Sequence, residues 1–155
     1  MSARRSKYSD TAIKALISAI DGDQEANQWL MENDFKELSA LKDVLNENND
    51  SALHFLLSNK RIFPTIVNFI GALQQDDKAR DELMITDDKV WAATASAVNG
   101  DEGATNWLLG NNFNIYADLA NLLAKNSNGP GSFKFGDTTF PPGGGTGLSG
   151  DFHVW

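Results

Sequence analysis

Apolar and polar residues follow one another in a pattern that returns about every 26 residues along most of the chain. Four copies align on an alanine: "GDQEANQWL", "NNDSALHFL", "QDDKARDEL" and "GDEGATNWL". The alanines are Ala26, Ala52, Ala79 and Ala104, separated by 26, 27 and 25 residues. Near-constant spacing over four copies indicates a repeat architecture in which each copy is one supersecondary unit.

Each copy carries the signals of a short helix with a cap at both ends. Three residues before the alanine stand side chains that accept hydrogen bonds from free N–H groups at a helix start, namely Asp23, Asn49, Asp76 and Asp101. Four residues after it, on the same helix face, stand Leu30, Leu56, Leu83 and Leu108. Seven residues after it stand candidate helix terminators, Asn33, Asn59, Thr86 and Asn111. The spacing predicts one helix of roughly nine residues per copy.

A second apolar segment with helical spacing precedes each cap. These segments are "TAIKALISAI", "KELSALKDVL", "PTIVNFIGAL" and "VWAATASAV", and "YADLANLLAKN" supplies a final half-copy. We therefore predict an all-α protein, a stack of four and a half short helical hairpins with nine helices. Stacking is required because so short a helix is unstable alone and neighbouring copies must bury its apolar face.

The pattern resembles α-solenoid repeat families of the HEAT and tetratricopeptide kind over residues 10–126. The units of those families are longer, and the tetratricopeptide signature is missing here, so no binding residue is carried over from them. The resemblance implies a protein-interaction scaffold.

After Asn126 the composition changes to "SNGPGSFKFGDTTFPPGGGTGLSGDFHVW". We divide the chain into a basic extension (1–9), a helical-repeat domain (10–126) and a tail (127–155). Gly-rich "PPGGGTGLSG" is typical of a flexible linker, but disordered segments are usually poor in aromatic residues. The predicted partner-binding residues are the tail aromatics Phe133, Phe135, Phe140, Phe152 and Trp155. Three alternatives remain open for the tail: it covers its own repeats, it docks into a partner, or it is disordered.

Charge and composition restrict the classes of partner. The net charge of −8 argues against nucleic-acid binding, which needs a basic face. Without cysteine the chain has no disulfide and no thiolate ligand. Arg4, Arg5 and Lys7 precede an apolar stretch as in a signal peptide, but Lys14 interrupts that stretch, and no run is long enough to span a membrane. We expect a cytoplasmic protein without membrane insertion.

Candidate catalytic and metal-binding residues are few. Asp21 and Asp23 suggest a calcium loop, yet the 12-residue ligand pattern is missing and a helix cap explains Asp23. His54 and His153 are the only histidines, and no nucleophile, phosphate-binding or zinc motif occurs. Glu82 replaces the Trp or Phe of the other copies and is expected to point outward. We expect no catalytic residue, no cofactor and no bound metal.

These features predict a non-catalytic interaction subunit or adaptor of a larger protein assembly, with the aromatic tail as its docking segment. One alternative is a self-assembling structural protein, such as a virion or coat component, with the tail swapped into a neighbouring copy. Another is a small-ligand-binding protein or enzyme with a pocket between repeats and tail. An acidic patch that attracts a basic partner is also consistent with the charge.

Overall fold

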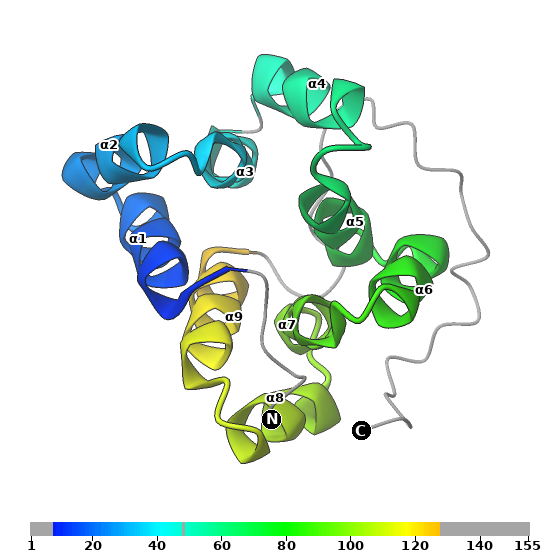
Figure 1. Cartoon of the computed structure of the whole chain (residues 1–155). Helices are drawn as coiled ribbons and strands as arrows, with labels where there is room; N and C mark the ends of the chain where they lie inside the picture. The colour runs from blue at the N-terminus through cyan, green and yellow to red at the C-terminus, as the bar shows by residue number, and fades with distance from the viewer. Residues whose placement is uncertain (1–7, 48, 128–155) are drawn as a thin grey trace. The chain divides into compact units, whose positions relative to one another are not determined.

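The computed structural model describes residues 8–47 and 49–127, and the regular structure in these residues is all α-helical. The helices are α1 (Asp10–Ile20), α2 (Gln24–Glu32), α3 (Lys36–Glu47), α4 (Asp50–Ser58), α5 (Pro64–Leu73), α6 (Asp77–Ile85), α7 (Lys89–Val98), α8 (Glu102–Gly110) and α9 (Asn114–Asn126) (Figure 1). The predicted all-α fold of short helical hairpins is therefore confirmed for these residues. Among the helices described, none has the length and apolar character needed to cross a membrane.

The second helix of each hairpin begins at the predicted cap. The carboxylate of Asp23 accepts hydrogen bonds from the backbone N–H groups of Glu25 (2.9 Å) and Ala26 (3.3 Å). The other three caps act in the same way, Asn49 on Ala52 (3.0 Å), Asp76 on Lys78 (3.0 Å) and Asp101 on Ala104 (3.2 Å). Each of these helices is nine residues long, as the spacing predicts. Asp21 and Asp23 therefore belong to a turn between two helices.

The turn within the first hairpin is short because Asp23 takes part in both helix ends. Its backbone N–H bonds to the last turn of α1, and its carboxylate caps α2. Gly22 adopts a positive φ of 104° immediately after α1. The N–H of the next residue, Asp23, then donates to the carbonyl of Ser18 (2.9 Å), which completes a Schellman motif. Gln75 and Gly100 adopt positive φ at the same place in their copies, at 66° and 98°. The chain reverses between α1 and α2 over Asp21–Asp23 alone.

The predicted terminators end the second helices by binding a carbonyl four residues back. Asn33 donates through its side-chain amide to the carbonyl of Trp29 at 2.8 Å. The equivalent pairs are Asn59 with Phe55 (2.8 Å), Thr86 with Glu82 (2.9 Å) and Asn111 with Trp107 (2.8 Å). The same four carbonyls also accept from the backbone N–H of the terminator residue, at 2.9–3.2 Å, so the side chain adds a second hydrogen bond at the helix end.

The described residues form two units, and the boundary between them lies within α5. In the N-terminal unit (residues 8–47 and 49–67), α3 packs against α1, α2 and α4. Two side chains fix these contacts. The Tyr8 hydroxyl donates to the buried carboxylate of Glu37 (3.0 Å), and the Asn46 amide donates to the carbonyl of Ile20 at the end of α1 (2.9 Å).

In the C-terminal unit (residues 68–127), α7 packs against α6, α8 and α9. Trp91 on α7 is fully buried between Phe69 and Tyr116, whose ring centroids lie 4.9 and 5.5 Å from its own, both edge-to-face. The Asn99 amide donates to the carbonyl of Leu73 (3.3 Å), again across 26 residues, as Asn46 does to Ile20 in the other unit. The repeat therefore reproduces a contact between hairpins as well as the helices themselves.

The leucine and alanine columns differ in burial. The four leucines are fully buried, as the shared helix face predicts. Ala79 and Ala104 in the C-terminal unit are also buried, at 3% and 0% exposure, but Ala26 and Ala52 in the N-terminal unit are only half-buried. The alanine column shares a helix face with the leucines but is fully buried only in the C-terminal unit. Glu82 is exposed, which confirms its predicted outward position.

Two glycines of the repeat region are expected to respond oppositely to alanine. Nothing lies within 4 Å of a Cβ added at Gly22 or at Gly110, so sterics outside the backbone do not decide either case. Gly22→Ala forces a side chain into positive φ and should lower the free energy of unfolding by about 1–2 kcal/mol. Gly110→Ala, at the helical end of α8, should raise it by about 0.5 kcal/mol. Urea unfolding followed by circular dichroism tests both, and equal effects would contradict the assigned backbone of Gly22.

Candidate interaction surface

The five tail aromatics predicted to bind a partner, Phe133, Phe135, Phe140, Phe152 and Trp155, lie outside the described residues. The suggested hairpin in "FKFGDTTF" lies there as well. The surface features below therefore come from the helical repeats alone.

A column of apolar residues points away from the core on the second helices. It stands five residues after each repeat alanine and consists of Met31, Leu57, Met84 and Leu109. Met31 and Leu109 are 55% and 49% exposed, whereas Leu57 and Met84 are half-buried. The preceding residue in each copy is the fully buried leucine, and one helical step turns the side chain by about 100°. The sequence pattern missed this column because an apolar residue beside the core stripe looks like part of the stripe.

A groove of about 480 Å³ in the N-terminal unit contains the first member of this column. Its walls come from α2 and α4, and α3 lies between them. Asn27 and Met31 line it from α2, and Ala52 and Phe55 line it from α4. The partial exposure of Ala52 follows from this position, because the groove lies beside the repeat alanine instead of a packed neighbour.

Hydrogen bonds and ring packing hold the groove open in a defined shape. Ser39, on the α3 floor, donates its hydroxyl to the amide oxygen of Asn27 at 2.6 Å. This bond occupies the oxygen of Asn27 and leaves its amide nitrogen as a donor. Phe55 packs on Phe63 with ring centroids 5.9 Å apart, which restrains its side chain at the opposite wall. One lining residue from each wall, Asn27 and Phe55, is therefore restrained by a contact within the unit.

The aromatic pair at Phe55 is itself a repeat feature that the sequence pattern did not reveal. Trp29 stacks on Phe35 (5.8 Å, 14° between planes), and Trp107 stacks on Phe113 (5.6 Å, 20°). In each pair a ring near the end of the second helix covers a ring at the start of the next helix. In the third copy both positions are acidic, Glu82 and Asp88. The replacement of Trp or Phe by Glu82 is thus one half of a paired change.

The segment that forms the groove carries a net negative charge. The described residues include 19 acidic and 9 basic side chains. Within 24–47 and 49–58 the exposed acids are Glu25, Glu32, Asp34, Glu47 and Asp50, while Lys36 is the one exposed base of those residues. Lys36 and Asp43 both line the groove, and Asp43 is already paired with Lys42 at 2.6 Å.

In the C-terminal unit the positions equivalent to Lys36 and Phe55 contact each other. They are Lys89 and Trp107, and the Lys89 ammonium lies 5.6 Å from the centroid of the Trp107 ring. This is a cation–π distance. In the N-terminal unit, by contrast, Lys36 is exposed, and the aromatic partner recorded for Phe55 is Phe63.

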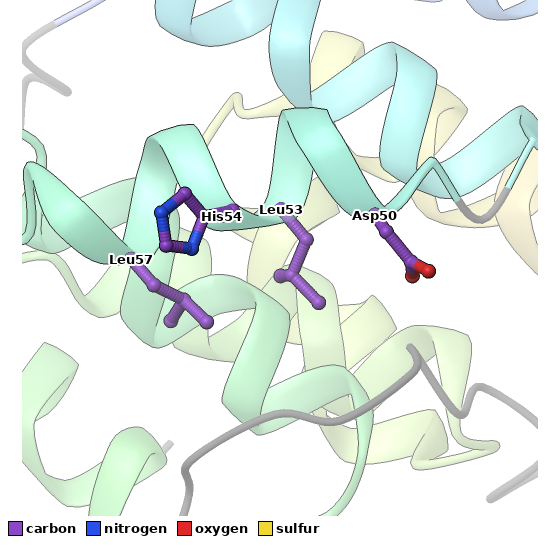
Figure 2. A pocket seen from close by; sticks show the side chains of 4 residues that line it. All are labelled: Asp50, Leu53, His54 and Leu57. Carbon is purple, nitrogen blue, oxygen red and sulfur yellow. The ribbon is translucent and has the colours of Figure 1, made fainter.

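A second depression, of about 340 Å³, lies along α4 and contains His54 (Figure 2). Its described lining comes from that helix alone, from Asp50, Leu53, His54 and Leu57. Leu53 and Leu57 project from the same side of α4 in Figure 2, and His54 is exposed. The His54 ring nitrogen Nε2 lies 3.4 Å from the Ser58 hydroxyl, at the long limit of a hydrogen bond. His54 is thus an exposed residue on the surface of α4.

No cluster of three or more His, Asp or Glu side chains that could hold a metal ion occurs among the described residues. Comparison of the chain with protein-family models, with curated proteins and with solved structures finds no match.

Proposed function

We propose that the protein is a non-catalytic interaction subunit, an adaptor that holds other proteins together in a larger assembly. In this proposal the aromatic tail is one docking segment and the helical repeats provide a second surface. The observation that supports it most directly is the exposure of Met31 and Leu109 at the same repeat position. Neither side chain is needed by the core, because the adjacent leucine already fills it.

Exposed apolar side chains at recurring positions are typical of surfaces that another protein covers. A single exposed leucine is ordinary, but here each unit exposes an apolar side chain at the same repeat position, Met31 in one and Leu109 in the other. The aromatic residues of the Gly-rich tail sequence suit the same role, since a few large buried side chains carry most of the energy of a protein interface. The two features together favour binding of proteins over binding of nucleic acid, which the acidic charge opposes.

An affinity capture from cells that produce the protein tests the role of the tail. The bait is the full chain, and the variant carries serine at Phe133, Phe135, Phe140, Phe152 and Trp155. We expect defined partner proteins with the full chain and their loss with the variant, at unchanged helix content by circular dichroism. Retention of the same partners by the variant would contradict a docking role for the tail. A variant that loses helix content would show that the aromatics belong to the fold.

A further inference from the structure

We propose that the groove between α2 and α4 binds a peptide segment of another protein that carries a large apolar side chain flanked by lysine or arginine. This inference rests on the proposed function and deepens it, because it names the chemistry of the partner recognised by the repeats. It concerns the N-terminal unit alone and does not involve the tail.

The shape and lining of the groove suit a side chain plus its neighbouring backbone. Its volume of about 480 Å³ exceeds that of any one side chain and falls in the range of small-ligand and peptide sites. Met31 and Phe55 face it from opposite walls, and Ala40 and Ala52 leave the space between them open. An aromatic or leucine side chain placed there would contact apolar atoms on three helices.

Polar groups around the apolar centre match the backbone of an extended peptide. The amide nitrogen of Asn27 is a donor, and the side chains of Asn49 and Ser51 add donors and acceptors at the α4 wall. The amide oxygen of Asn49 already accepts from the Ala52 N–H, so its amide nitrogen is the group left to donate to a peptide. A peptide backbone needs such partners because each buried N–H or C=O left unpaired is costly.

Charge selects a basic peptide. Five exposed carboxylates and one exposed lysine stand in the segment that carries the groove, so a cationic ligand is attracted and an acidic one repelled. Asp43 lies in the groove itself and shares its charge with Lys42, which is mostly covered. Lysine or arginine beside the apolar anchor would be favoured by the net negative charge of this segment.

A random twelve-residue peptide library displayed on phage tests the proposal on the full-length protein. We expect enrichment of peptides with a Phe, Trp, Leu or Met flanked by basic residues. A synthetic enriched peptide, measured by fluorescence anisotropy, should bind Met31→Glu at least about 10-fold more weakly. Ile85→Glu is the matched control, because Ile85 is an exposed apolar residue of a second helix in the C-terminal unit and lies outside the apolar column. The affinity of this variant should stay within about 2-fold.

Reversing the charge of one lining residue tests independently whether the bound peptide is basic. Lys36→Glu removes the one exposed base in the groove and should tighten peptide binding by about 3-fold, with a steeper loss of affinity as salt is raised. Weaker peptide binding by Lys36→Glu would overturn the basic-peptide assignment. A library selection that enriches acidic peptides, or no peptides at all, would overturn it as well. Equal losses of affinity in Met31→Glu and Ile85→Glu would show that the groove is not the site.

Methyl resonances of the three methionines identify the occupant of the groove in the free protein. We expect the Met31 methyl signal to move when the peptide is added, with Met84 as an internal reference, and to stay unchanged on dilution. A shift on dilution would place a second copy of the chain in the groove. A shift in the variant with serine at the five tail aromatics would place the tail there, and either result would overturn the proposal. The two proposals can fail separately. If the tail variant loses its partners but its Met31 signal still responds to the peptide, the tail is a docking segment and the groove is an independent peptide site.

Discussion

Replacement of Trp91 by alanine should destabilise the C-terminal unit by about 4 kcal/mol, more than any other substitution considered. Trp91 is fully buried on α7, and its ring makes edge-to-face contacts with Phe69 and Tyr116. Alanine removes these contacts, each of which contributes about 0.5–1.5 kcal/mol beyond the area buried. It also leaves a cavity that three packed helices cannot close fully.

Urea unfolding followed at the helical circular dichroism band measures this effect. Trp107→Ala provides the control, because Trp107 is only half-buried and stacks on Phe113 at the surface of the same unit. We expect its cost to be about 1–2 kcal/mol. Equal losses for the two variants would mean that Trp91 does not occupy the centre of the unit.

Leu108→Ala should cost about 3 kcal/mol, whereas Leu109→Ala should change the free energy of unfolding by less than about 0.5 kcal/mol. The two residues are neighbours in α8 and are chemically identical, but Leu108 is fully buried and Leu109 is 49% exposed. Intrinsic helix propensity therefore cancels in the comparison, and the difference reports burial.

The same urea experiment on both variants decides this prediction. A large loss for Leu109→Ala, or similar losses for both, would show that α8 presents a different face to its neighbours. That result would also remove Leu109 from the exposed apolar column and weaken the support for the proposed function.

Helices and caps could be predicted from sequence because their signals are local. Asp23 lies within three residues of the N–H groups that it caps, and Asn33 lies four residues from the carbonyl that it binds. Leu30 is buried because the helix period places it one turn after Ala26, on the helix face that turns toward the core. Such relations span a single helical turn, so one sequence is sufficient to reveal them.

Features that depend on how three helices pack could not be predicted in this way. Ala52 and Ala104 occupy the same column, but one lines a groove and the other is completely buried. The difference arises from their neighbours in other helices, which repeat spacing does not specify. Met31 was missed for a related reason, since an apolar residue next to the core leucine has the same character whether it is covered or exposed.

The tail prediction was made from composition and is tested by neither the fold nor the surface of the repeats. Phe133, Phe135, Phe140, Phe152 and Trp155 remain predicted partner-binding residues, and their lack of any place in the repeat pattern is the reason for expecting that role. By contrast, the groove in the N-terminal unit is defined by described side chains from α2, α3 and α4.

Backbone NMR assignment with ¹³Cα secondary shifts tests the central claim, that capped two-helix modules recur about every 26 residues. The account predicts helical shifts over Gln24–Glu32, Asp50–Ser58, Asp77–Ile85 and Glu102–Gly110, each preceded by a break at its cap. It also predicts positive φ at Gly22, Gln75 and Gly100, directly before three of those caps. Helical shifts that ran unbroken through these three residues, or extended-strand shifts in any of the four segments, would contradict it.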